Sequence, residues 1–194
     1  IEIDLLRQGR RRVGRQELRR AAYEKMLGRF GDRTASRYLI WREFQEPEKP
    51  VIILLGGSSG VGKTSLALEV ARRLGISRVL STDSIRQVMR LTLSPELMPS
   101  IHASSFEAHR SIANATGQTE AAESDVVDGF MNQASLVSVG VRAMIERAIE
   151  ESTSMVLDGV SLVPGLIDLN AFAEDAHVIY LVVARLDEDS FRNH

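Results

Sequence analysis

The segment Gly57-Ser-Ser-Gly-Val-Gly-Lys-Thr64 constrains the fold of this 194-residue chain more than any other feature. It follows the apolar run Val51–Leu55 and leads into Lys63–Leu74, where apolar residues recur at helical spacing. The pattern G-x-x-x-x-G-K-[ST] between a strand and a helix is typical of a phosphate-binding loop. Its glycines let successive backbone N–H groups point at an anion, and the start of the helix adds the positive end of its dipole. We therefore expect the loop to bind the phosphates of a nucleotide.

ATP with Mg²⁺ is the ligand that this loop predicts. Lys63 would bring a positive charge to the β- and γ-phosphates, and the Thr64 hydroxyl would bind Mg²⁺. The alternative, a glycine-rich turn with an incidental lysine, does not explain the complete pattern with both flanking elements. The residues predicted to bind the nucleotide are Gly57, Ser58, Ser59, Gly60, Val61, Gly62, Lys63, Thr64 and Ser65.

Apolar runs alternate with helical patterns after the loop. Arg78–Ser81, Met155–Asp158 and Val178–Val183 are predicted strands, the last two of the type that is buried on both faces. Val141–Glu151 is a predicted amphipathic helix, whereas the polar stretch 92–135 indicates only short helical pieces. This alternation predicts an α/β fold, a doubly wound parallel sheet of the P-loop nucleoside triphosphate hydrolase/kinase type, preceded by a small helical segment.

The chain divides near residue 50. Residues 1–50 contain 13 Lys and Arg against 8 Asp and Glu, whereas residues 51–194 contain 11 against 18. Two helices are predicted between Gln16 and Phe44, with a break near 28–32, and the prolines of 46–50 predict a linker. We expect a helical segment at 1–45, a linker at 46–50 and a P-loop domain at 51–194 that stops before its lid and last strand, as part of a longer protein.

Composition and charge disfavour several classes of protein. No apolar run approaches the roughly 18 residues of a membrane-spanning helix, and the chain has no cysteine for disulfides or thiolate metal sites. A cytoplasmic protein without a membrane partner is therefore expected. The arginines between residues 7 and 20 have no aromatic residues among them, which favours a solvated helix face over a nucleic-acid surface. The oligomeric state is not indicated.

Two carboxylates stand at the C-terminal ends of predicted strands, at the sheet edge where ligands bind in open parallel sheets. Asp158 stands where P-loop enzymes place a carboxylate that holds Mg²⁺, although a turn cap is the alternative. Asp83 is placed to orient the attacking hydroxyl of an acceptor and to take its proton. Its alternative is a helix N-cap, because a helix begins at this point.

Arginines near these carboxylates are candidates for stabilising the transferred charge. Arg86, one turn beyond Asp83, is either a clamp for an acceptor carboxylate or phosphate or a surface arginine. Arg185 and Arg192 follow the last predicted strand, where a lid begins, or they belong to an ordinary charged helix. The predicted catalytic residues are Lys63, Asp83, Arg86 and Arg185, and the predicted metal ligands are Thr64 and Asp158.

Two longer pieces of the chain carry specific patterns, Ser81-Thr-Asp-Ser-Ile-Arg-Gln-Val-Met-Arg90 and Leu157-Asp-Gly-Val-Ser-Leu-Val-Pro-Gly165. Further pieces are Ser36–Arg42, Ile53–Thr64, His102–Phe106 and Gly129–Gln133. Together these pieces, from about residue 34 to 192, resemble the 2-phosphoglycerate kinase family. The resemblance implies transfer of the γ-phosphoryl group of ATP to the 3-hydroxyl of 2-phosphoglycerate, giving 2,3-bisphosphoglycerate. It also implies that residues 1–44 are the trailing part of an ATP-cone-like region.

The resemblance further implies that Asp83 and Arg86 handle the acceptor and that His102, Ser104 and Ser105 line its site. Because 2-phosphoglycerate carries a phosphate and a carboxylate, we expect cations around it, and the candidates are Arg86, Arg90 and Arg110. The family pattern Glu-Gly-Val-His is Asp158-Gly-Val-Ser161 in this chain. The shorter carboxylate can still hold Mg²⁺, whereas loss of the histidine could alter the acceptor pocket.

Two alternatives to 2-phosphoglycerate kinase activity stay open at this point. One is a P-loop kinase for another small hydroxylated metabolite, which the change at Ser161 supports. The other is an ATP-dependent switch or interaction module that acts through its N-terminal helices without a small-molecule acceptor.

Overall fold

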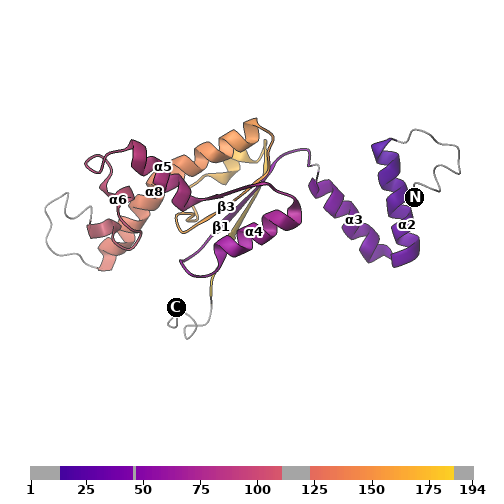
Figure 1. Cartoon of the computed structure of the whole chain (residues 1–194), viewed down its shortest axis with the longest axis horizontal. Coiled ribbons are helices and arrows are strands. Elements are labelled where there is room, and N and C mark those ends of the chain that lie inside the picture. Colours follow the sequence, from indigo (N-terminus) through magenta and orange to yellow (C-terminus); the bar gives the residue numbers. More distant parts are fainter. Residues whose placement is uncertain (1–13, 46, 111–122, 186–194) are drawn as a thin grey trace. The chain divides into compact units, whose positions relative to one another are not determined.

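The computed structural model describes residues 14–45, 47–110 and 123–185 (Figure 1). The chain divides into two compact units, Ile1–Glu48 and Lys49–His194. Within the described ranges, no helix combines the length and apolar character needed to cross a membrane. The two units are described separately.

The first unit contains two consecutive helices, α2 (Arg15–Phe30) and α3 (Asp32–Gln45). Gly31 ends α2 with a φ of 83°, and its N–H donates to the Leu27 carbonyl oxygen at 3.1 Å. Ala22 and Ala35 are buried, since small side chains allow the two helices to pack together. The break falls inside the range 28–32 that the sequence indicates.

The second unit is built on a parallel sheet with the strand order β2-β3-β1-β4. Its strands are β1 (Val51–Gly56), β2 (Arg78–Ser81), β3 (Met155–Gly159) and β4 (His177–Val182). Every residue of the two central strands, β1 and β3, is buried. Together with the helices that cover the sheet, this arrangement confirms the predicted α/β fold.

The register brings the functional ends of the strands to one edge of the sheet. Leu55 of β1 lies opposite Asp158 of β3, and Ser81 of β2 lies opposite the same aspartate. The phosphate-binding loop leaves β1 directly after Gly56. Residues that follow β1, β2 and β3 therefore meet at one edge.

Helices cover both faces of this sheet, as Figure 1 shows for α4 (Lys63–Leu74) and α8 (Glu123–Glu150). Apolar residues of α8 pack on alternate residues of the central strands. The resulting core contains Ile52, Leu54, Val137, Val141, Ile145, Met155 and Leu157. On α4, Ala67 and Ala71 are buried, which allows this helix to lie close to the strands. This unit also contains α5 (Thr82–Thr92), α6 (Pro99–His102) and the 3₁₀ helix η1 (Leu169–Phe172).

Helix α8 begins 18 residues before the predicted start of the helix at Val141. Two glycines inside it, Gly129 and Gly140, are contact points in the fold. A Cβ at Gly129 would lie 2.5 Å from the Cα of His109, and one at Gly140 would lie 2.5 Å from Cγ2 of Ile85. Close packing against neighbouring segments, rather than chain reversal, explains both glycines.

Strand β4 differs from the prediction of a strand buried on both faces. Ile179, Leu181 and Val182 are exposed, whereas Val178 and Tyr180 pack against the core. These three side chains are exposed because β4 is an edge strand among the described residues. One of its faces is not covered by the elements described here. A continuous apolar run indicates a strand but does not tell how many of its faces are covered.

Candidate active site

The phosphate-binding loop requires glycine at two of its positions for different reasons. Gly57 has a φ of 143°, and a Cβ there would overlap the carbonyl oxygen of Val183. Gly62 precedes α4 in the left-handed conformation, with a φ of 88°. Any residue with a side chain would be strained at these positions. Glycine avoids this strain, so the backbone can turn its N–H groups toward a phosphate.

Lys63, the first residue of α4, is folded back over this loop. The residue is only 7% exposed, and its Nζ donates a hydrogen bond to the Ser58 carbonyl oxygen. Burial lowers the pKa of Lys63 from its ordinary value, although the negative charges of Asp158 and Asp83 act in the opposite direction. The lysine is therefore held close to the loop in a setting that favours a nearby anion.

Thr64 and Asp158 lie in direct contact. The Thr64 hydroxyl donates to Oδ2 of Asp158 at 2.7 Å, and Asp158 is a buried residue of β3. A strand residue paired with the loop in this way does not act as a turn cap. Hydroxyl and carboxylate oxygens are the type of ligand that Mg²⁺ prefers, so the pair fits the metal that the sequence predicts at this position.

Asp83 and Arg86 project from the first turns of α5. Ser81, not Asp83, caps this helix, because the Ser81 Oγ accepts a hydrogen bond from the Ser84 N–H at 3.1 Å. Arg86 donates from Nη2 to Oδ1 of Asp83 at 3.2 Å and from Nη1 to the Ala103 carbonyl oxygen at 2.6 Å. With its side chain 17% exposed, Arg86 is not a free surface arginine.

A cavity of about 600 Å³ joins the loop to this pair. Gly57, Ser58 and Ser59 form one side of it, and Asp83 and Arg86 are the charged residues among those that line it within the described ranges. The remaining wall is largely apolar and comes from α8 and from the segments after α6 and β3. That wall contains Ser104, Ser105, Phe106, Val126, Val127, Phe130, Val160, Leu162, Val163 and Pro164, with Val182 from β4.

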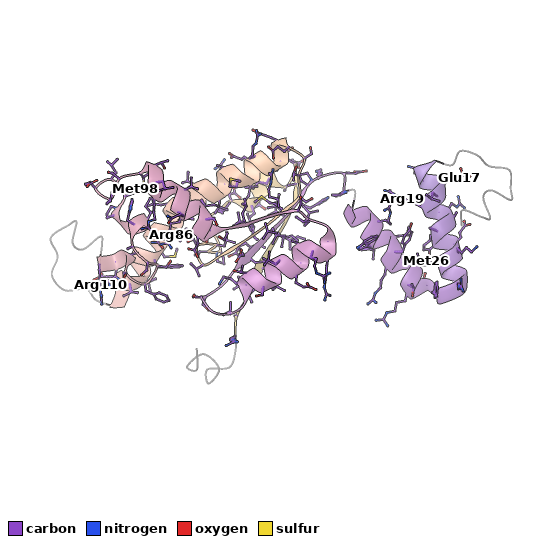
Figure 2. The ribbon with its side chains drawn as sticks, in the orientation of Figure 1. Glu17, Arg19, Met26, Arg86, Met98 and Arg110 are labelled. Carbon is purple, nitrogen blue, oxygen red and sulfur yellow. The ribbon has the colours of Figure 1, made fainter. Side chains whose placement is uncertain are left out.

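Several predicted residues do not line this cavity. Arg90 is exposed and donates to Oε1 of Gln87 at 3.4 Å, and Arg185 is exposed beyond the end of β4. Arg110 lies beside the N-terminal end of α8, while Arg86 comes from α5 (Figure 2). His102 shares a hydrogen bond of 2.8 Å with the Leu93 carbonyl oxygen. It therefore holds the segment near Leu93 and is not part of the cavity wall.

Ser161, the position of the family's histidine, is buried and is absent from the cavity wall. The neighbouring Leu162 carbonyl oxygen accepts a hydrogen bond from the Tyr180 hydroxyl at 2.8 Å. Having serine in place of histidine at position 161 therefore would not alter the acceptor pocket through a direct contact with the cavity. Arg192 lies outside the described residues.

Gln133 of α8 is a residue that sequence reasoning passed over. It is fully buried and hydrogen-bonds to the segment from Ser100 to Ser105. The signal in the sequence is weak: a glutamine inside a matching piece, at a position that only the tertiary fold shows to be buried.

The parallel sheet, the loop after its central strand β1 and the carboxylate on the adjacent strand β3 define a P-loop nucleotide-binding domain of the kinase type. The chain belongs to the zeta toxin family, whose model matches residues 36–160.

Archaeal proteins named 2-phosphoglycerate kinase are similar to the chain over most of its length. One from Pyrococcus furiosus is 41% identical over 190 residues, which is 97% of this chain and 60% of that protein. One from Methanothermobacter thermautotrophicus is 48% identical over 133 residues, which is 69% of this chain and 42% of that protein. A third, from Methanocaldococcus jannaschii, is 34% identical over 177 residues, covering 91% of this chain and 55% of that protein. The predicted family resemblance is confirmed, and the chain spans between about two fifths and three fifths of the length of these relatives.

Proposed function

We propose that the protein transfers the γ-phosphoryl group of MgATP to the 3-hydroxyl of 2-phosphoglycerate and so forms 2,3-bisphosphoglycerate. One observation carries the proposal: the phosphate-binding loop and the Asp83–Arg86 pair face the same cavity. A donor phosphate on the loop and a hydroxyl near Asp83 would then share one cavity. The names of the archaeal relatives supply the acceptor.

In this proposal the nucleotide is held by the loop. Backbone N–H groups of Gly57–Thr64 and the ammonium of Lys63 would bind the β- and γ-phosphates, and Thr64 with Asp158 would hold Mg²⁺. Magnesium, when bound, neutralises charge that develops on the phosphates. The Thr64–Asp158 hydrogen bond keeps these two groups together before the metal binds.

The acceptor would bind on the side of Asp83 and Arg86. The carboxylate of Asp83 would orient the 3-hydroxyl and take its proton, which is the role of a positioned general base. Arg86 would offer its guanidinium to an anionic group of the acceptor. Arg185 remains our candidate for a lid arginine, and Arg90 and Arg110 remain candidates for the second anionic group of the acceptor.

The proposal also includes the cellular location of the enzyme and the roles of its two parts. A cytoplasmic location fits a cysteine-free chain. Residues 1–45 are assigned to the trailing part of an ATP-cone-like region, and residues 51–194 to the catalytic domain.

A second acceptor class is favoured by one feature of the cavity. Its wall is largely apolar, with Phe106 and Phe130 among the lining residues, and Arg86 is its cation within the described ranges. A hydroxylated metabolite with an apolar part would use this wall better than a three-carbon acid does. A panel of such acceptors belongs in the same assay.

The test is ADP release by the full-length protein with MgATP, with and without 2-phosphoglycerate. Stimulation by 2-phosphoglycerate, abolished in Lys63→Ala and Asp83→Ala, is the expected result. Binding of ATP without stimulation by 2-phosphoglycerate would reject this acceptor. ADP release that no acceptor in the panel stimulates would instead favour an ATP-dependent switch.

A further inference from the structure

Gln133 is fully buried, and its amide is bonded to one short segment. Its Nε2 donates to the carbonyl oxygens of Ser100 and Ala103, the second at 3.1 Å, and its Oε1 accepts from the Ser105 hydroxyl at 2.9 Å. A buried amide is costly unless it is hydrogen-bonded, and here both donors and the acceptor oxygen have partners. Gln133 therefore ties residues 100–105 to α8.

The Ala103 carbonyl oxygen accepts a second hydrogen bond, from Nη1 of Arg86 at 2.6 Å. A carbonyl oxygen has two lone pairs, so Gln133 and Arg86 together satisfy it. Arg86 in turn donates to Asp83 at 3.2 Å. A continuous chain of contacts thus runs from Gln133 through the Ala103 carbonyl and Arg86 to Asp83, whose side chain lines the cavity.

Ser105 is the second route from Gln133 to the cavity. Its hydroxyl proton is committed to Oε1 of Gln133, while the residue itself lines the cavity. The lone pairs of the Ser105 oxygen are then left to accept a hydrogen bond from a ligand. Because Gln133 accepts the hydrogen bond that this hydroxyl donates, Ser105 can bind a ligand only as a hydrogen-bond acceptor. Its partner on the ligand would be a donor such as a hydroxyl group.

We propose that Gln133 is a positioning residue for the phosphoryl acceptor. It would act through two groups that line the cavity, the Ser105 hydroxyl and the Arg86 guanidinium, and it does not line the cavity itself. The kinetic part of this inference rests on the proposed kinase function, because it needs an acceptor in the cavity. The nucleotide side of the site is not linked to Gln133 by these contacts, so ATP binding should be insensitive to it.

The neighbouring Asn132 supplies a matched control. Its Oδ1 accepts from the Ser100 hydroxyl at 2.8 Å, so it holds the same short helix α6 through a side-chain hydrogen bond. That bond reaches neither the Ala103 carbonyl nor Ser105. Loss of the Asn132 contact therefore loosens α6 without removing the two links to the cavity.

The experiment compares Gln133→Met, which keeps the side-chain volume, with Asn132→Leu and the unchanged full-length protein. In Gln133→Met we expect the KM for 2-phosphoglycerate to rise about tenfold, as loss of a buried hydrogen bond implies. The KM for ATP should stay within about twofold, because its contacts are separate. In Asn132→Leu both constants should stay near their original values. An unchanged acceptor KM in Gln133→Met, an equal rise in both KM values, or the same rise in Asn132→Leu would overturn the proposal.

A second readout does not depend on the acceptor. Amide hydrogen exchange in peptides covering residues 103–107, measured without ligand, reports local opening of the segment. Faster exchange in Gln133→Met than in Asn132→Leu is expected, and equal rates in the two variants would refute the positioning role. If the unchanged protein shows no response to 2-phosphoglycerate, the proposed acceptor fails, while the exchange data still decide on Gln133.

Discussion

Lys63 shows at the scale of one residue how the loop is prepared for an anion. The residue is almost buried, its ammonium donates to the Ser58 carbonyl oxygen, and burial lowers its pKa because the charged form loses hydration. Asp158 and Asp83 offset part of this effect. A bound phosphate would add negative charge beside the lysine and so favour its protonated form.

This electrostatic setting predicts a pH dependence for ATP binding. Only protonated Lys63 attracts phosphate, and its pKa is lowered, so affinity should fall as the pH rises through that pKa, earlier than for an ordinary lysine. The loss should approach about tenfold per pH unit above the pKa. Calorimetric titration with MgATP across the alkaline range would measure it. Lys63→Arg keeps its charge at these pH values, so its profile should be flat, and parallel profiles for the two proteins would contradict the role of Lys63.

A second residue-scale prediction concerns Gly56, the last residue of β1. The hydrogen bond from the Tyr180 hydroxyl to the Leu162 carbonyl oxygen passes next to it, and a Cβ at Gly56 would lie 2.6 Å from that carbonyl oxygen. Gly56→Ala should lower the free energy of unfolding by about 1–3 kcal/mol, because the buried backbone has to move. Tyr180→Phe, which removes only the hydrogen bond, should cost about 1 kcal/mol. Urea unfolding measures both values, and a neutral Gly56→Ala would show that the site has room to relax.

At the scale of elements, α8 joins the hydrophobic core to the cavity. Its C-terminal half packs on the sheet through Val137, Val141 and Ile145. Its N-terminal half supplies Phe130 to the cavity wall and Gln133 to the segment beside Arg86. A single helix of 28 residues therefore couples the stability of the sheet to the geometry of the proposed acceptor site.

The two glycines of α8 should respond differently to alanine. At Gly129 the added Cβ would meet the backbone of His109, which cannot move as one side chain does, so Gly129→Ala should destabilise by about 1–3 kcal/mol. At Gly140 it would meet the Cγ2 of Ile85, and rotation of that side chain should reduce the loss. Alanine's higher helix propensity, worth about 1 kcal/mol, acts against destabilisation at both sites. Denaturant unfolding compares the two variants with the unchanged protein. A Gly129→Ala variant that is more stable than the unchanged protein would contradict the close contact.

At the scale of the whole molecule, the parts that the sequence predicted well depend on local patterns. The loop at 57–64, the strands around it and the placement of Asp158 beside Thr64 follow from hydrophobic runs and motif spacing. The first half of α8 did not follow, because it lies in a polar stretch, where Gly129 serves a contact with the distant His109. Arg90 and Arg110 were selected for charge alone, and neither lines the described cavity. Gln133 could not be recognised, since its role depends on partners about thirty residues away.

Phosphoryl transfer to a named acceptor is the central claim, and it can be tested by following the phosphorus atom. Full-length protein is incubated with ATP labelled in the γ-phosphoryl group, Mg²⁺ and 2-phosphoglycerate, and the products are separated by chromatography. We predict that the label appears in 2,3-bisphosphoglycerate in equal amount to the ADP formed, and that Lys63→Ala forms neither product. Label recovered only as inorganic phosphate, with 2-phosphoglycerate unchanged, would contradict the claim.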